Sequence, residues 1–395
     1  MSSVKSAENL VEKMKATLLD YGKVYGSERL VECKSCHFVT SCGLRFVKSM
    51  FTIMQKLADA GLKCKVPLTA NPRPLDTKAY PLLERLVGSY LYGKQSLLES
   101  LLLKLGLISR DAFTCTPYYI GNKPEYGEVV AWAESSAVIY ANSVIGARTN
   151  RYSAMIELFS GILGLTPEFG LLLDENRKAS WLIEVKTTSR PKFFVLGSLI
   201  GKTILEDIPY IVGLDRWDVN EYELKDMGAA MASWGAVGLF HVEEVTPEAK
   251  EKERSKLLEE GYRRLVVDDL SMKEIEALMR KGEHDSEPDL IVIGCPHLSK
   301  EQIADWVRKV EGRRFTRRTL MLAAPKIIDE VKNSRDYMRL QNAGVCLSSI
   351  CPLMFTNIPI TKRLRIVTNS GKLAYYSHAI FMDDSQLLEK FTAPA

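Results

Sequence analysis

The chain has 395 residues, of which 46% are hydrophobic, 26% charged and 9% aromatic. This composition is typical of a globular protein, and it excludes a disordered chain, a collagen and a miniprotein that depends on disulfides. The 53 Lys and Arg nearly balance the 49 Asp and Glu, so the net charge of +4 gives no support for a general nucleic-acid-binding surface.

The first half of the chain predicts helices that alternate with short apolar strands. Residues 1–15 carry charges and no apolar run of the length of a signal peptide, so we expect a cytoplasmic protein whose eight cysteines are reduced. The expected helices cover residues 7–25, 44–60, 79–105 and 130–145, and the expected strands cover residues 29–33 and 63–67.

The second half repeats the alternation of strands and helices. The apolar run 289–294 predicts a buried parallel strand, and Ser299 begins a helix N-cap signature, so Cys295 is expected at the carboxyl end of a strand, where open α/β sheets bind ligands. We expect further strands at 319–324, 343–347 and 364–368, a helix at 325–333, and a solvated helical surface over the charge-dense segment 248–281.

These elements predict an α/β fold in two parts, an N-terminal part over residues 1–235 and a C-terminal part over residues 236–395. The longest weakly polar stretch, 228–242, has about 15 residues, whereas a membrane span needs roughly 20. We therefore expect no membrane segment.

One segment resembles a phosphate-binding loop. Gly197 and Gly201 precede Lys202 and Thr203, but only three residues separate the two glycines where the loop needs four. The backbone N–H groups could not close around a phosphate, so we interpret the glycines as packing residues.

Four cysteines near the N-terminus allow two interpretations. Cys33 and Cys36 form a Cys-x-x-Cys pair beside His37, with Cys42 and Cys64 further along the chain. They could form a structural zinc site. The absence of a second Cys-x-x-Cys pair leaves scattered core or loop thiols as the alternative.

Three other cysteines, Cys115, Cys295 and Cys351, each lie near a proline and beside a predicted strand end. Thiolates from three loops could hold an iron–sulfur cluster and leave one iron open as a Lewis acid. Spacing alone favours three unrelated loop cysteines.

The segment 121–151 combines a weakly polar helix with a polar turn. Ser135 and Asn142 lie seven residues apart and share one stripe of the predicted helix, which stops at Gly146 and is followed by Arg148 and Arg151. Such a fork of cationic donors suits a small anionic substrate. A capped core helix with internal hydrogen bonds is the alternative.

The whole stretch from Thr114 to Arg151 resembles the signature of the aconitase X family. The resemblance covers about residues 7–380 and includes the further motifs at 66–72, 170–176, 294–297, 324–325, 351–352 and 368–372. It implies an aconitase-like catalytic chain of several α/β units that catalyses a dehydration. Because the chain ends at Ala395, we expect it to lack the swivelling domain of the family's single-chain members. It would then be a large subunit that pairs with a separate small swivelling subunit.

The family also implies roles for individual residues. Cys115, Cys295 and Cys351 would bind a 4Fe-4S cluster with one open iron, or a 3Fe-4S cluster when oxidised. The substrate-binding residues would be Asn71, Glu134, Ser135, Ser136, Asn142, Arg148, Asn150, Arg151, Asp174 and Lys372. The catalytic base would be a serine of the small subunit.

Within the family, agreement over the central motif favours the archaeal branch. Its members dehydrate (R)-5-phosphomevalonate to trans-anhydromevalonate 5-phosphate in a modified mevalonate pathway of isoprenoid biosynthesis. Another hydroxy acid such as cis-3-hydroxyproline is the alternative substrate. A non-catalytic zinc-binding or scaffold protein is a further alternative.

Overall fold

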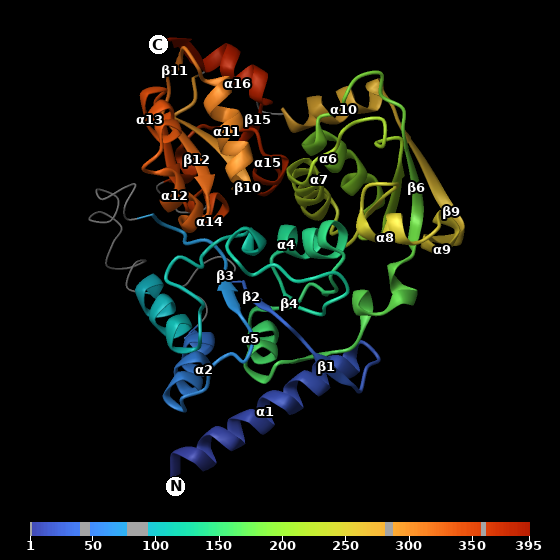
Figure 1. The fold of residues 1–395 in the computed structure, drawn as a ribbon, viewed down its shortest axis with the longest axis vertical. Coiled ribbons are helices and arrows are strands. Elements are labelled where there is room, and N and C mark those ends of the chain that lie inside the picture. The colour runs from blue at the N-terminus through green and yellow to red at the C-terminus, as the bar shows by residue number, and fades with distance from the viewer. Residues whose placement is uncertain (1, 40–47, 77–93, 281–286, 357–360) are drawn as a thin grey trace.

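The computed structural model describes residues 2–39, 48–76, 94–280, 287–356 and 361–395. The chain forms three units, each with its own parallel sheet, and this confirms the expected α/β class (Figure 1). The first unit lies at the bottom of Figure 1, the third at the upper left and the second at the upper right. No helix in the described residues is long and apolar enough to cross a membrane.

The first unit is built on the parallel sheet β3-β2-β4, and a short antiparallel pair, β1 with β5, lies beside it. A side chain at Gly161 of α5 would lie 2.8 Å from Cys36 Sγ of β2, so this glycine allows the helix to pack directly on the sheet. The unit comprises α1 (Ser2–Val24), β1 (Leu30–Glu32), β2 (Cys36–Phe38), α2 (Lys48–Asp59), β3 (Leu68–Ala70), a helix at 94–104, η1 (Pro117–Tyr119), β4 (Ala131–Trp132), α4 (Ser135–Tyr140), the π-helix η2 (Ala141–Ile145), α5 (Ala154–Leu163), β5 (Leu165–Pro167), η3 (Gly170–Leu172) and η4 (Asp174–Arg177).

The second unit has the parallel strand order β8-β7-β6-β9. Helices α6 and α7 can approach closely because Gly197 has no side chain. A Cβ atom at this position would lie only 2.2 Å from Met227 O, which is too close for any other residue. The unit comprises β6 (Ala179–Val185), α6 (Phe193–Ile204), β7 (Pro209–Val212), α7 (Glu221–Trp234), β8 (His241–Val242), α8 (Pro247–Glu251), α9 (Arg254–Leu257), β9 (Leu258–Val267) and α10 (Asp269–Met279).

The third unit has the parallel order β13-β12-β10-β14-β15, with the small antiparallel pair β11–β16 beside it. The chain moves from β10 to β12 and β13 on one side, then returns to β14 on the other, so the strand order reverses beside β10. The unit comprises β10 (Leu290–Leu298), α11 (Lys300–Lys309), β11 (Arg313–Phe315), β12 (Thr319–Ala323), α12 (Pro325–Val331), α13 (Arg335–Asn342), β13 (Val345–Ser348), α14 (Pro352–Thr356), η5 (Thr361–Arg363), β14 (Ile366–Thr368), α15 (Gly371–Tyr376), β15 (Ile380–Phe381), α16 (Asp384–Phe391) and β16 (Thr392–Pro394).

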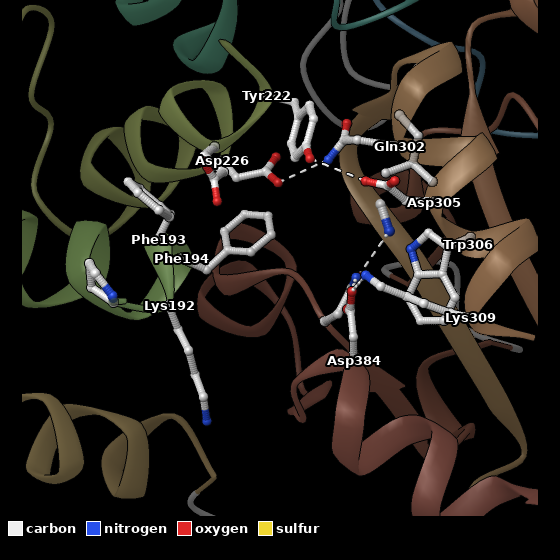
Figure 2. Close-up of a pocket in the computed structure, with 15 residues that line it drawn as sticks. Lys192, Phe193, Phe194, Tyr222, Asp226, Gln302, Asp305, Trp306, Lys309 and Asp384 are labelled. Atoms are coloured by element: carbon white, nitrogen blue, oxygen red, sulfur yellow. Dashed lines mark hydrogen bonds and ion pairs between the residues drawn. The ribbon is translucent and has the colours of Figure 1, made fainter. Parts of the chain in front are cut away.

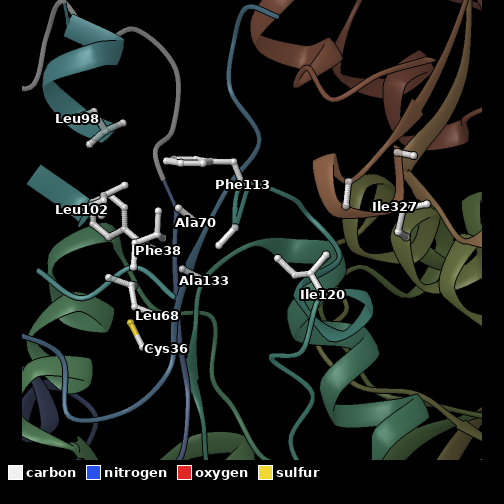
Figure 3. Packing of buried hydrophobic residues seen from close by; sticks show 14 of the residues in the cluster. Cys36, Phe38, Leu68, Ala70, Leu98, Leu102, Phe113, Ile120, Ala133 and Ile327 are labelled. Carbon is white, nitrogen blue, oxygen red and sulfur yellow. The ribbon is translucent and has the colours of Figure 1, made fainter. Parts of the chain in front are cut away.

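Buried apolar side chains of the first and third units belong to one continuous cluster. It contains Phe113 and Ile120 of the first unit and Ile327 of the third (Figure 3). The second unit has a separate core around β6, α6 and α7. Apolar packing therefore continues across the junction between the first and third units.

Several expected elements differ in the structure. The charge-dense segment 248–281 contains β9, a ten-residue edge strand whose side chains are mostly exposed, as well as helices. The expected helix 130–145 begins only at Ser135, after β4. The glycines of the sequence that resembles a phosphate-binding loop lie inside α6. The division expected at residue 235 falls between α7 and β8.

Candidate active site

Three cysteines from distant parts of the chain approach one another where the first and third units join. Cys295 lies towards the carboxyl end of β10, Cys351 follows β13, and Cys115 precedes η1. Burial raises the pKa of the Cys115 thiol to about 12 and that of Cys351 to about 11. Burial also raises the pKa of Cys295, and the charges of Cys115 and Cys351 add to this effect, so the three thiols lie within electrostatic reach of one another.

The backbone around Cys295 leaves the regular strand. Gly294 has φ +90°, and a Cβ atom there would lie 2.7 Å from the side chain of Leu298, so glycine is required. The pairing of β10 with β12 changes register between Ile293 and Leu298. The Cys295 segment therefore departs from regular pairing with β12 at the carboxyl end of the central strand β10, beside which the strand order reverses.

The turn after β14 holds the Cys295 segment from the other side. Asn369 Oδ1 accepts a hydrogen bond from Gly294 N at 3.1 Å, and the hydroxyl of Ser370 donates to the Cys295 carbonyl. Ser370 also caps α15, since its Oγ accepts from Leu373 N at 3.1 Å. The same turn therefore fixes the cysteine segment and directs the first turn of α15, which carries Lys372.

Lys372 of the third unit and Glu134 of the first form a buried ion pair. Their side chains are 4% and 8% exposed, and the Lys372 ammonium donates to Glu134 Oε1 and, at 3.1 Å, to Ser136 Oγ. Ser136 Oγ donates to Glu134 Oε2 at 2.6 Å, and the same oxygen accepts from Ala137 N at 2.7 Å. Glu134 thus acts as the N-cap of α4 and as the partner of the lysine.

Both members of this pair stay charged. Burial by itself lowers the pKa of Lys372, but the Glu134 carboxylate and the thiols of Cys295 and Cys115 raise it more, so the pKa lies above its ordinary value. Burial alone would raise the pKa of Glu134, yet Lys372 lowers it below the ordinary value. The charge of Lys372 also opposes the rise that burial causes in the pKa of all three thiols. It therefore favours thiolates and other anions at this junction.

Asn71 lies on the first-unit side of this network. The Nε2 atom of His37 is 3.1 Å from Asn71 Oδ1, and its Nδ1 atom is 2.8 Å from Thr69 Oγ1. Burial lowers the pKa of His37 to about 4, and the nearby Glu134 carboxylate opposes that shift. The imidazole is therefore neutral and fixes the orientation of the asparagine amide.

Asn142 and Asn150 are bonded within the protein. Asn142 Nδ2 donates to Thr149 O and to Gly238 O, each at 2.9 Å, and Asn142 Oδ1 accepts from Thr149 N at 3.0 Å. Asn150 Oδ1 accepts from Leu171 N at 2.9 Å. Both side chains hold the turn that carries the two predicted arginines.

Arg177, for which no role was predicted, also holds this turn. It is 1% exposed, pairs with Glu248 at 2.9 Å, and donates to Asn142 Oδ1 at 3.2 Å and to the carbonyls of Asn142 and Ala147. No local sequence pattern marks Arg177, because its partners Glu248, Asn142 and Ala147 lie 30 to 71 residues away.

Arg148, Arg151 and Asp174 lie beside the second unit. Arg148 donates to Asp174 Oδ1 at 2.5 Å and to Leu172 O at 2.7 Å, and its hydrogen bond is the main reason that the pKa of Asp174 is lowered. Arg151 is exposed and donates to Ala236 O at 3.2 Å. Glu134, Ser136 and Lys372 therefore gather near the thiols, with Ser135 next to Ser136 in sequence. The arginines instead bond to residues on the side of the second unit.

A cavity of about 280 Å³ borders the Cys295 segment between the second and third units (Figure 2). Gly294 and Asn369 line it together with side chains of both signs, including Lys192, Asp226 and Lys309. Figure 2 shows Tyr222 of α7 turned towards Asp305 of α11 across this space, and their hydrogen bond measures 3.1 Å.

Two groups of cysteines differ in their surroundings. One group, Cys33, Cys36 and Cys64, gathers along α5. There Cys33 donates a hydrogen bond to Ser160 O and Cys36 donates to Glu157 O. Cys42 lies outside the described residues. Within the described ranges, no three His, Cys, Asp or Glu side chains are arranged to hold a single metal ion. The group around Cys295 instead lies within electrostatic reach of the Lys372 cation, and the Cys115 thiol accepts a backbone N–H, features suited to a thiolate-bound cluster.

Comparisons with known proteins cover all three units. Family models described as Aconitase X first, second and third domain match residues 3–175, 179–277 and 288–389. The crystal structure of Thermococcus kodakaraensis aconitase X in its holo-form superposes with a TM-score of 0.84 and 29% identity, over 97% of this chain and 95% of that chain.

The similar curated proteins are named dehydratases. The phosphomevalonate dehydratase large subunit of Thermococcus kodakarensis is 32% identical over 390 residues, which are 96% of this chain and 95% of that protein. The protein of the same name from Methanocaldococcus jannaschii is 31% identical, over 94% of this chain and 93% of its own length. The cis-3-hydroxy-L-proline dehydratase of Pseudomonas aeruginosa is 30% identical over 91% of this chain, but the match covers only 62% of that protein.

Proposed function

This chain belongs to the aconitase X family, and we propose that it is the large subunit of an iron–sulfur hydro-lyase that dehydrates (R)-5-phosphomevalonate to trans-anhydromevalonate 5-phosphate. The observation that carries this proposal is that two buried thiols, Cys115 and Cys295, and the half-buried thiol of Cys351 lie within electrostatic reach of the Lys372–Glu134 pair. The family resemblance favours this substrate because the match to the large subunits named above extends over nearly the full length of both chains.

Cys115, Cys295 and Cys351 would hold a 4Fe-4S cluster. Such a cluster with three cysteine ligands supplies one open iron as a Lewis acid that makes a hydroxyl group a better leaving group. The three thiols have raised pKa values because they are buried, and the charge of Lys372 opposes this shift. The lysine therefore assists the loss of the thiol protons that ligation requires.

The chain's own polar groups would bind and orient the substrate. Lys372 presents a permanent charge at the junction, where it can attract a carboxylate, and the Ser136 hydroxyl lies beside it. Ser135, the preceding residue, would offer a further hydroxyl group. Arg148 and Arg151 would bind anionic groups of the substrate at the edge of the cleft. Asn142 and Asn150 would act indirectly, because their side chains hold the turn that carries the two arginines. Asn71 and Asp174 would border the same cleft.

We propose that the proton next to the substrate carboxylate is removed by a serine of a small partner subunit. Loss of this proton and of the hydroxyl group from the adjacent carbon forms the double bond and releases water. The relatives' designation as large subunits supports such a partner. The closed complex would exclude water from the junction and so strengthen the electrostatic interactions of Lys372.

The direct test is an anaerobic assay of the chain with and without a co-expressed small subunit. Conversion of (R)-5-phosphomevalonate to the anhydro product, followed by mass spectrometry, is expected only with both subunits. Cis-3-hydroxy-L-proline serves as the competing substrate in the same assay. Turnover of the hydroxyproline alone would refute the substrate assignment, and full turnover by the large chain alone would refute the role of the partner.

A further inference from the structure

The four polar groups of His297 bond to three other segments of the chain. The residue is fully buried, and its backbone N–H donates to Cys115 Sγ at 3.3 Å. Its Nδ1 atom lies 3.0 Å from Thr114 Oγ1, and its Nε2 atom lies 3.2 Å from Ile350 O. Thr114 and Ile350 are the residues directly before Cys115 and Cys351. One imidazole, two residues after Cys295, therefore connects the segments of all three cysteines.

The hydrogen-bonding partners of His297 determine which nitrogen of a neutral imidazole carries the hydrogen. Because the Ile350 carbonyl can only accept, Nε2 carries the hydrogen and Nδ1 accepts from the Thr114 hydroxyl. Thr114 Oγ1 in turn accepts from Thr116 N at 3.0 Å. The chain of bonds thus has one direction, and it orders the Cys115 loop on both sides of the thiol.

The second unit holds the same residue through its carbonyl. Lys225 of α7 is 1% exposed, and its ammonium donates to His297 O at 3.1 Å and to Gln302 Oε1 at 2.5 Å. Gln302 belongs to the capping box of α11, the helix that follows the His297 segment. All three units therefore meet at this one residue.

We propose that His297 is a positioning residue that holds the Cys115, Cys295 and Cys351 segments at the separation needed to take up and retain the cluster. This inference rests on the proposed function, because it assigns the three cysteines as ligands. The imidazole itself touches neither the substrate nor the reacting atoms. Its effect is to make the three thiol positions depend on one another before any iron binds.

Three substitutions separate the two side-chain bonds. His297→Gln can keep a donor near Nε2 for the Ile350 carbonyl, His297→Asn can keep a polar atom near Nδ1 for Thr114, and His297→Ala keeps neither. His241→Ala is the matched control, because His241 is also buried and bonds a carbonyl, Arg177 O, at 2.8 Å. It lies in the second unit and forms none of the bonds to the cysteine segments that His297 forms.

The first readout is the loss of iron after anaerobic reconstitution of the full chain with iron and sulfide. We expect His297→Ala to lose its visible absorbance to a chelator at least about tenfold faster than the wild type, a factor equivalent to about 1.4 kcal/mol. The Gln and Asn variants should be intermediate, and the electron paramagnetic resonance spectrum should change in all three. His241→Ala should lower the melting temperature but keep the wild-type rate and spectrum.

The second readout does not need iron. In the metal-free chain, hydrogen exchange of peptides over residues 112–118 and 348–354 should be faster in His297→Ala, and unchanged in His241→Ala. Unchanged exchange, or a folded His297→Ala that keeps its iron at the wild-type rate, would overturn the inference. Iron that persists in Cys295→Ser would instead refute the proposed function, whatever the exchange of the His297 variants.

Discussion

Lys372 and Glu134 are separated by 238 residues in the sequence and form a buried ion pair that joins the third unit to the first. Removal of one partner from such a pair leaves an uncompensated charge in the protein interior. The pair also places a cation beside three thiols.

We therefore expect Glu134→Gln to destabilise the chain by about 3–5 kcal/mol in denaturant unfolding, because Gln keeps an oxygen for the cap of α4 but leaves Lys372 unpaired. The double variant Glu134→Gln with Lys372→Met should lose less stability than the sum of the two single variants. Strict additivity of the two changes would contradict the buried pair.

Glu157 predicts a pH dependence of stability. The residue is fully buried, and burial raises its pKa well above the ordinary value. Among the residues that the structure describes, only its Oε1 atom has a partner, the backbone N–H of Val39. The folded state therefore keeps a proton that the unfolded state loses above its own pKa. The contribution of Glu157 to the free energy of unfolding is therefore complete below the pKa that this residue has in the unfolded chain. Above that pH the free energy of unfolding falls by about 1.4 kcal/mol per pH unit, until the pH reaches the pKa of Glu157 in the folded protein.

The variant Glu157→Gln resembles the protonated carboxyl group at every pH. We expect it to be more stable than the wild type at pH 7 to 8 and equal to it near pH 4, measured by denaturant unfolding across that range. A constant difference between the two proteins at all pH values would show that Glu157 does not titrate in this way.

The arginine turn predicts an effect on substrate kinetics. Arg148→Lys keeps a charge near Asp174 but loses the planar fork that reaches Leu172 O at the same time. Lysine at Arg148 or Arg151 should raise the KM or lower the kcat at least tenfold, or about 1.4 kcal/mol. Melting temperatures should change little because both arginines are partly or fully exposed. Normal kinetics of both variants would exclude this turn as an anion site.

Local patterns in the sequence predicted some parts of the site and missed others for physical reasons. The apolar run before Cys295 and the cap at Ser299 predicted a strand, a turn and a helix, and β10 and α11 confirm this order. Strand β9 was missed because it is an edge strand with mostly exposed, charged side chains, so it lacks the apolar alternation of a half-buried strand.

Contacts between distant residues leave no local signal. The sequence alone could not pair Lys372 with Glu134, although the family motifs named both residues. Asn142 was expected to line the cleft, and the structure shows its side chain bonded to Thr149, Gly238 and Arg177. His297 was part of a recognised motif, but its bonds to Thr114 and Ile350 depend on the three-dimensional arrangement of three loops.

The most direct test of the account compares iron and sulfide content in six single Cys→Ser variants after anaerobic reconstitution. Serine at Cys115, Cys295 or Cys351 provides a harder ligand that ionises less readily, so each of these variants should lose the cluster absorbance and the activity. Serine at Cys33, Cys36 or Cys64 should leave the iron content and the spectrum intact, with at most a modest loss of stability where the thiol is buried. A chain that keeps its iron without Cys295 but loses it without Cys36 would contradict the assignment of the active site.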